Sequence, residues 1–241
     1  MLAGKQAILA MKLVLTCEHG GNKIPKKYVS FFKNQQAILE THRGLDLGAL
    51  DIFESLKSLS DFSQFSKTSR LLIELNRSLH HKNLFSEFSK EISIEEKEKL
   101  IHTYYSTYRN KVENKIEEYI NIGETVLHIS IHSFTPFLKG EIRNCDVGLL
   151  FDPKRPLEKH FSKSFRAHIL KINPNYNIRY NYPYLGKADG FTTYLRKQFL
   201  ENYIGIELEI NQRFSENNLM DSHLKQDIFT VLESYSTGKL K

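Results

Sequence analysis

Apolar residues recur along the chain in two spacings, one typical of buried strands and the other of amphipathic helices. Short apolar runs rich in branched residues, bounded by glycine, proline or polar residues, predict strands buried on both faces. These runs lie at 12–17, 69–78, 126–132, 147–152, 177–180 and 203–212. Apolar residues at every third or fourth position predict helices from Asp46 onward and over 91–118, 157–172, 192–202 and 221–235.

The order of these elements predicts the fold class. Strands and helices alternate along most of the chain, which is typical of an α/β domain with a largely parallel mixed sheet and helices on both faces. No repeat, low-complexity segment or linker interrupts the pattern, so residues 1–241 are interpreted as a single domain. The first ten residues are interpreted as an extension, with Met11 as an alternative start of the chain.

Composition narrows the class of protein. Of the 241 residues, 40% are hydrophobic, which is enough for a substantial core. The net charge is +6, but the lysines are spread without a dense basic block, which argues against nucleic-acid binding. A small anionic substrate would also suit this charge. The two cysteines, Cys17 and Cys145, provide no disulfide framework and no Cys-x-x-Cys metal site.

The same composition bears on where the protein acts. No apolar run reaches the length of about 18 residues that a membrane span requires, and the start of the chain lacks a clear cleavage site for a signal peptide. We therefore expect a cytoplasmic enzyme without a membrane partner. The sequence leaves its oligomeric state open.

Two histidines stand where predicted strands give way to loops. His19 follows the first strand in the stretch Glu18-His19-Gly20-Gly21-Asn22, and His132 ends the strand at 126–132. Ligands of α/β proteins bind at the carboxyl ends of the strands. His132 is therefore a candidate zinc ligand of a hydrolase, and His19 contacts either metal or substrate unless it is an exposed residue of a plain turn. His128, about 13 Å further up the strand, is interpreted as a core histidine.

Other polar residues near the ends of elements are further candidates. Asp46 starts a helix, where it either caps that helix or ligates a metal, and spacing does not separate the two. Asn76 and Arg77 leave the second predicted strand, where a guanidinium fork and an adjacent amide suit a substrate carboxylate, unless Arg77 is a structural partner of a nearby acid. Arg143 lies in a loop and either reaches a pocket or stays exposed. The stretch 181–190 has the proline and glycine content of a pocket-lining loop.

The last predicted strand carries two acids among apolar residues. Glu207 and Glu209 share one face with Asn211, because successive side chains of a strand point to opposite faces. Two acids on a core-like strand are unfavourable unless they meet water, cations or a metal. One interpretation is an edge strand with a wet face. The other is that one acid is a general base acting on a metal-bound water.

Taken in order, five short motifs resemble the N-formylglutamate amidohydrolase family over residues 12–213. They are CEHGGNKIP at 17–25, HRGLDLGA at 42–49, RLLIELNR at 70–77, IHS at 131–133 and ELEIN at 207–211. The resemblance implies a zinc-dependent amide hydrolase with a phosphorylase/hydrolase-like α/β fold, like that of the zinc carboxypeptidases and other zinc exopeptidases. The reaction for which the family is named is hydrolysis of N-formyl-L-glutamate to formate and L-glutamate.

Three of these patterns are also similar to the zinc carboxypeptidases. The stretch around His132 is similar to the strand that brings their second histidine ligand. Asn76-Arg77 is similar to the pair with which they grip the substrate carboxylate, and Glu209 to their catalytic glutamate. This resemblance favours Glu209 over Glu207 as the base.

The sequence departs from the carboxypeptidases at the first pair of ligands. Their motif is His-x-x-Glu, whereas Asn22 follows His19 at that spacing and is a poor zinc ligand. The third protein ligand must therefore come from elsewhere. Asp46 is the first choice and Glu18 the second, because the side chain of Glu18 should point away from that of its neighbour on an extended chain.

The resulting hypothesis has one Zn²⁺ per chain, held by His19, His132 and Asp46, with Glu209 as the general base. The residues expected to bind substrate or shape its pocket are Asn76, Arg77, Arg143, Asp189 and Thr192. Two alternatives remain. One is the same metal chemistry on another N-acyl amino acid or a small peptide, and the other is a non-catalytic binding protein on the same scaffold.

Overall fold

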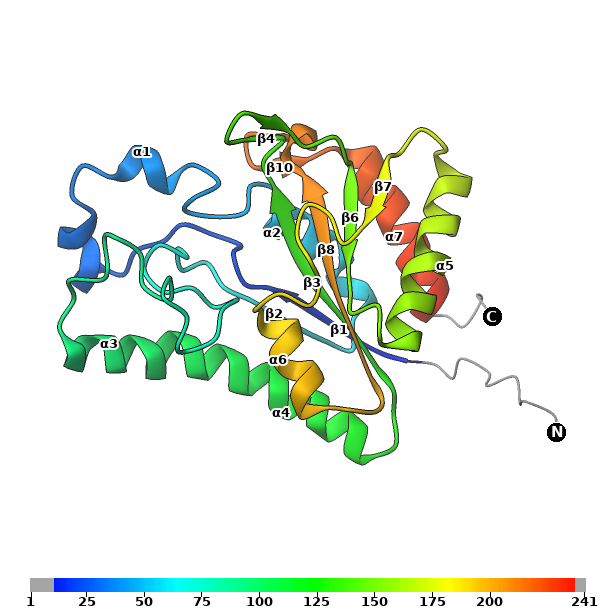
Figure 1. Ribbon diagram of the computed structural model, residues 1–241, viewed down its shortest axis with the longest axis horizontal. Coiled ribbons are helices and arrows are strands. Elements are labelled where there is room, and N and C mark those ends of the chain that lie inside the picture. Colours follow the sequence, from blue (N-terminus) through cyan, green and yellow to red (C-terminus); the bar gives the residue numbers. More distant parts are fainter. Residues whose placement is uncertain (1–10, 237–241) are drawn as a thin grey trace.

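The computed structural model describes residues 11–236, and its centre is a six-stranded sheet (Figure 1). The strands follow the order β2-β1-β3-β8-β6-β7. Their bounds are β1 (Lys12–Cys17), β2 (Phe62–Phe65), β3 (Val126–Phe134), β6 (Val147–Leu150), β7 (Ile178–Tyr180) and β8 (Tyr203–Asn211). The first four strands in the order are parallel, β6 pairs antiparallel with β8, and β7 pairs parallel with β6. The sheet is thus mixed and largely parallel, as predicted.

Helices cover both faces of this sheet, which also agrees with the prediction (Figure 1). One face carries α2 (Ala49–Leu56), α5 (Pro156–Ile172) and α7 (Ser222–Ser236), and the other carries α4 (Thr107–Asn121) and α6 (Phe191–Gln198). The smaller elements are η1 (Lys26–Phe32), α1 (Gln36–Leu39), η2 (Lys57–Leu59), α3 (Ile94–Leu100), η3 (Ile101–Ser106), η4 (Gln212–Phe214) and the hairpins β4 (Phe137–Leu138)–β5 (Glu141–Ile142) and β9 (Ser215–Glu216)–β10 (Leu219–Met220). None of the helices within 11–236 has the length and apolar character needed to cross a membrane.

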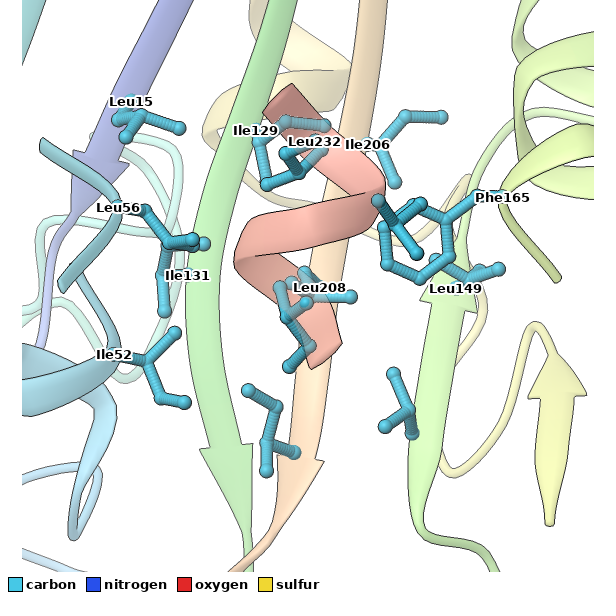
Figure 2. Close-up of a cluster of buried hydrophobic side chains, with 14 of the residues drawn as sticks. Leu15, Ile52, Leu56, Ile129, Ile131, Leu149, Phe165, Ile206, Leu208 and Leu232 are labelled. Carbon is cyan, nitrogen blue, oxygen red and sulfur yellow. The ribbon is translucent and has the colours of Figure 1, made fainter. Parts of the chain in front are cut away.

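The face of the sheet under α2, α5 and α7 is apolar. Alternate residues of β1, β3 and β8 point to this face and pack against the three helices, forming a continuous core (Figure 2). Figure 2 labels Leu15, Ile129, Ile131, Ile206 and Leu208 among the strand residues of this core. Its burial stabilises the sheet independently of the chemistry on the opposite side.

The opposite face carries a row of polar side chains. The row consists of Thr16, Glu18, His128, Ser130, His132, Glu207 and Glu209, all buried except the half-buried Glu207. His128 lies between Thr16 Oγ1 (2.8 Å from Nε2) and the Tyr203 hydroxyl (2.7 Å from Nδ1), so it is a core histidine with both ring nitrogens satisfied. Because β8 lies inside the sheet, its acids do not belong to a wet edge strand.

Residues 69–78 do not form the predicted strand. Their apolar members Leu71, Leu72, Ile73 and Leu75 are buried in a chain of turns, where they pack into a second core with α3 and α4. Burial by loops and helices, rather than pairing in a sheet, therefore explains the apolar run. The strand beside β1 is instead β2, whose sequence Phe-Ser-Gln-Phe is too short and polar to have been recognised.

Helix boundaries differ from the prediction in places that matter for the site. α2 begins at Ala49 rather than Asp46, and no side chain caps it. The Asp46 carboxylate is therefore not a helix cap. The segment predicted to be helical at 91–118 contains two α-helices, which are joined by the π-helical η3, and Ser93 caps the first of them. The predicted extension at 1–10 lies outside the described residues.

Candidate active site

The polar row ends at a cavity of about 270 Å³, where the carboxyl ends of β1, β3 and β8 meet. His19 lies two residues beyond the end of β1. His132 lies near the end of β3, in register with Glu209 of β8. The cavity is lined by His19, Asp46, Arg70, Asn76, Arg77, His132, Ser133, Tyr184, Leu185, Ala188, Asp189, Glu207 and Glu209. Three segments that are far apart in the sequence thus form its floor.

Three buried side chains in this cavity form a cluster that could hold a metal ion. One ligand atom from each of His19, Asp46 and His132 lies within 4.8 Å of the others. Both imidazoles turn Nδ1 toward the same Asp46 oxygen, Oδ2, at 3.3 Å for His19 and 2.8 Å for His132. The main-chain N–H of Asp46 also donates to the main-chain oxygen of His19 (3.0 Å), which ties the two segments together.

The far side of the His19 ring is held by a second carboxylate. His19 Nε2 contacts Glu74 Oε1, and Arg70 bridges this acid to Asp46, with 2.7 Å from Nη2 to Glu74 Oε2 and 3.0 Å from Nη1 to Asp46 Oδ1. Metal-binding histidines characteristically give their other ring nitrogen to such a carboxylate, which fixes the ring and leaves the first nitrogen for the metal.

The far side of the His132 ring is held in the same way. His132 Nε2 lies 2.9 Å from Ser130 Oγ, 3.2 Å from Glu18 Oε2 and 3.3 Å from Asn76 Nδ2. Glu18 also accepts hydrogen bonds from Ser130 Oγ (2.6 Å) and from the hydroxyl of Tyr108 (3.0 Å). Glu18 therefore lies behind the His132 ring, whereas Asp46 lies between the two Nδ1 atoms and is the better placed third ligand.

The electrostatics of the cluster suit a cation. Burial would lower the pKa of His132, but the adjacent Asp46 and Glu18 raise it well above its ordinary value. Burial opposes ionisation of Asp46, yet the neighbouring histidines and Arg70 hold its pKa well below the usual range. Two imidazoles and one carboxylate, with outer groups that fix both rings, fit the set of donors typical of catalytic zinc sites.

Glu209 differs from its neighbour Glu207 in having an unsatisfied oxygen. Glu209 is 5% exposed, and its Oε2 has no hydrogen-bond partner among the described residues. Burial raises the pKa of this carboxyl to about 8. Glu207 Oε1 instead accepts a hydrogen bond from Thr192 Oγ1 (2.7 Å). A buried and unpaired carboxyl that faces a cavity is a candidate for proton transfer.

Asn76 and Arg77 lie on a turn at the cavity wall rather than at the end of a strand. Asn76 Oδ1 accepts a hydrogen bond from the Phe191 N–H (2.6 Å), which leaves its amide nitrogen directed at His132. Arg77 Nη1 donates to the main-chain oxygen of Asp189. Asp189 Oδ2 in turn accepts a hydrogen bond from the Ser78 N–H (3.0 Å). The loop that carries Asp189 is therefore fastened to the Arg77 turn.

The loop predicted to shape the pocket does line the cavity, through Tyr184, Leu185, Ala188 and Asp189. It packs closely on β6, where the main-chain oxygen of Tyr182 approaches Gly148. A Cβ atom added to this glycine would lie 2.1 Å from that oxygen. Thr192 and Arg143 are not among the lining residues. Thr192 orients Glu207, and Arg143 stacks on the Tyr184 ring and donates to its hydroxyl (3.1 Å).

Sequence reasoning did not identify three residues of the site, Arg70, Glu74 and Tyr184. Arg70 and Glu74 lie in the apolar run that was interpreted as a strand, and their charge within such a run was the available signal. Tyr184 carries no such signal, since an aromatic residue in a loop is common. The structure brings together His19, Asp46, His132, Glu209, Asn76, Arg77 and Asp189 around one cavity.

Two solved structures show the same fold. Gene product Atu2144 from Agrobacterium tumefaciens is 20% identical with a TM-score of 0.80, over 96% of this chain and 92% of that one. An N-formylglutamate amidohydrolase from Ralstonia eutropha JMP134 is 14% identical with a TM-score of 0.70, over 95% of this chain and 93% of that one. A metallo-carboxypeptidase from Burkholderia cenocepacia gives a TM-score of 0.41 at 12% identity, over 95% of this chain and 57% of that one.

Comparison of sequences gives a more specific result than comparison of folds. No curated protein matches the chain. However, residues 11–215 match the N-formylglutamate amidohydrolase family, a stretch that contains every element of the cavity. The protein therefore belongs to the N-formylglutamate amidohydrolase family and is a hydrolase that acts on amide bonds, as the motifs of its sequence predicted.

Proposed function

We propose that this protein is a zinc-dependent hydrolase of N-acyl amino acids, and that it converts N-formyl-L-glutamate to formate and L-glutamate. One observation carries the proposal: Glu209, whose Oε2 has no hydrogen-bond partner within residues 11–236, shares a small cavity with three clustered metal donors. The name of the family supports the choice of substrate. The volume of about 270 Å³ also supports it, because it lies below the range of about 300–1,000 Å³ that drug-sized ligands occupy.

His19, His132 and Asp46 would hold the metal ion. When bound there, zinc lowers the pKa of a water molecule and polarises the acyl carbonyl group. Glu74 and Glu18 keep each imidazole turned so that Nδ1 faces the cavity. Arg70 balances the charge of Asp46 and Glu74, which reduces the repulsion between two buried acids.

Glu209 acts as the general base in this proposal. Its carboxylate takes a proton from the attacking water and delivers it to the amine nitrogen of the departing amino acid, so that one group serves both steps. Burial raises the pKa of Glu209 by disfavouring its ionised form. A metal cation held in the same cavity would favour the ionised form and so lower this pKa. Glu207, already bonded to Thr192, is less free to move a proton.

Arg77 and Asn76 would bind a carboxylate of the small anionic substrate. The guanidinium of Arg77 is anchored by one nitrogen to Asp189, which leaves its other N–H groups for a ligand. Charge-assisted hydrogen bonds of this kind are stronger than neutral ones and fix the orientation of the substrate. The amide nitrogen of Asn76 contacts His132, one of the metal donors. A carboxylate bound at Asn76 would therefore place the acyl group of the substrate beside these donors.

Metal analysis combined with formate release tests the proposal. We expect one zinc per chain and turnover of N-formyl-L-glutamate in the unaltered protein, loss of both in His132→Ala, and loss of turnover alone in Glu209→Gln. Full activity in both variants would refute the mechanism. N-acetyl-L-glutamate and a glutamyl dipeptide serve as competing substrates, and faster hydrolysis of either would refute the substrate assignment. Zinc binding without any turnover would indicate a binding protein.

A further inference from the structure

A second cavity adjoins the catalytic one. Its volume of about 470 Å³ exceeds that of the catalytic cavity, and it opens among the turns of residues 70–90. Arg70 lines both cavities, so the two spaces adjoin at this residue. The proposed hydrolysis takes place in the catalytic cavity and does not use this second one.

The charges around the second cavity are predominantly positive. Its lining includes the cations Arg43, Arg70, Lys82 and Lys90 and the acids Glu74 and Glu87. Both acids are already engaged, because Glu74 binds His19 and Arg70, and Glu87 binds Arg43. Lys82 forms no ion pair within residues 11–236, whereas Lys90 lies 4.0 Å from the exposed Glu91 and also helps to lower the pKa of Glu87. The lining of this cavity therefore has an excess of positive charge, to which the exposed Lys82 and Lys90 contribute.

A neighbouring histidine reflects the same positive potential. Burial together with Arg43, Arg70 and Arg143 lowers the pKa of His42. The arginines thus form a basic zone that reaches from the second cavity toward Tyr184 at the catalytic one. An anion would be attracted to this zone because the lining of the second cavity carries four cations against two acids.

We propose that the second cavity binds an anionic group, a carboxylate or a phosphate, through Lys82, Lys90 and Arg43. Arg70 of this cavity is bonded to Asp46, so an anion bound there lies one residue away from the clustered metal donors. The anion has two sources. It is either the far end of an acidic substrate longer than N-formyl-L-glutamate or a separate small anion. The link to catalysis rests on the proposed function, but the binding of the anion does not.

Calorimetric titration of the full-length, metal-loaded chain with inorganic phosphate tests the site. We expect the Kd for phosphate to rise about five- to tenfold in the double variant Lys82→Ala/Lys90→Ala. The matched control is Lys159→Ala/Lys163→Ala, which removes the same charge from exposed positions on α5, on the opposite face of the sheet, and should leave the Kd unchanged. Equal Kd values in all three proteins, or equal losses in both variants, would overturn the proposal.

Kinetics then distinguish the two sources. If the anion is part of the substrate, the double variant raises KM for N-formyl-L-glutamyl-L-glutamate and leaves KM for N-formyl-L-glutamate unchanged. If it is a separate anion, phosphate alters KM for N-formyl-L-glutamate in the unaltered protein but not in the double variant. Failure of the proposed function would look different, since turnover would be absent while phosphate binding still depended on Lys82 and Lys90.

Discussion

The side chain of Arg109 lies beneath the turn that carries Arg77, and its Nη1 donates a hydrogen bond to the main-chain oxygen of Arg77 (3.1 Å). The same nitrogen donates to the main-chain oxygen of Leu75 (3.1 Å). Arg109 is 4% exposed, its guanidinium is covered by the rings of Tyr105 and Phe191, and it forms no ion pair in the described part of the chain. The charge of Arg109 therefore orients the carbonyl groups of Leu75 and Arg77. Because Arg109 belongs to α4, this helix fixes the turn from which the Arg77 side chain enters the cavity.

We expect Arg109→Lys to raise KM for N-formyl-L-glutamate about tenfold, with kcat and bound metal within about twofold. Lysine keeps the charge but lacks the planar fork, and a buried carbonyl left without a donor costs about 1–3 kcal/mol. Steady-state kinetics and metal analysis check this. A comparable fall in kcat, or loss of metal, would show that Arg109 supports the whole site rather than the turn.

Replacing Glu209 by Gln should lower kcat by a factor of about 10²–10⁴, because the general base is lost while the shape of the cavity is kept. Bound zinc should be retained, since Glu209 is not one of the clustered donors. Glu207→Gln is the matched control, on the same strand and the same face. If that control lost more activity than Glu209→Gln, the two acids would have been assigned in the wrong order.

Glu209 should also make the stability of the metal-free protein depend on pH. Its pKa of about 8 in the folded state exceeds the ordinary value of 4.5, so the folded protein binds a proton that the unfolded chain has lost between these values. The free energy of unfolding should therefore fall as pH rises through this window, by up to about 1.4 kcal/mol per pH unit. Denaturant unfolding in a chelator at pH 5 and pH 8.5 measures the effect.

The corresponding control is again Glu209→Gln, which cannot ionise. The histidines of the cluster titrate as well, so only the difference between the two proteins reports on Glu209. We expect the variant to be more stable than the unaltered protein at pH 8.5 and closer to it at pH 5. A difference that does not change with pH would mean that this carboxyl titrates normally.

Metal affinity should separate the roles of Asp46 and Glu18. Asp46→Ala removes a proposed ligand and should abolish stoichiometric zinc binding. Glu18→Gln removes only the charge behind His132 and should weaken zinc binding about ten- to hundredfold, as is usual for groups that orient a ligand. Competition with a chelator of known affinity gives both values. The opposite order would make Glu18 the third ligand.

The sequence predicted the parts of the site that follow from the alternation of side chains in strands. His132, Glu207 and Glu209 interrupt apolar strands at positions that point to one face, and polar residues there require a reason. The largely parallel sheet with helices on both faces followed from the alternation of strands and helices along the chain, and the place of the site from the binding of ligands at strand ends. Asp46 could be named as a candidate but not assigned, because its role depends on where α2 begins.

The remaining features depend on contacts between segments that are distant in the sequence. Glu74 and Arg70 occupy an apolar run that is buried by loops, and nothing in the run itself distinguishes this burial from pairing in a sheet. β2 is a short edge strand stabilised mainly by its partner β1. β6 likewise pairs antiparallel with β8, a direction that the apolar pattern of neither strand indicates.

The difference between the two faces of the sheet has a consequence for how the protein tolerates change. In β3, Leu127, Ile129 and Ile131 face the apolar core, whereas His128, Ser130 and His132 face the polar row. Substitutions at the first set can be compensated by repacking among hydrophobic neighbours of similar volume. Those at the second set leave polar partners unpaired. Variants selected for thermal stability should therefore gather on one side of this strand, while variants with altered catalysis gather on the other.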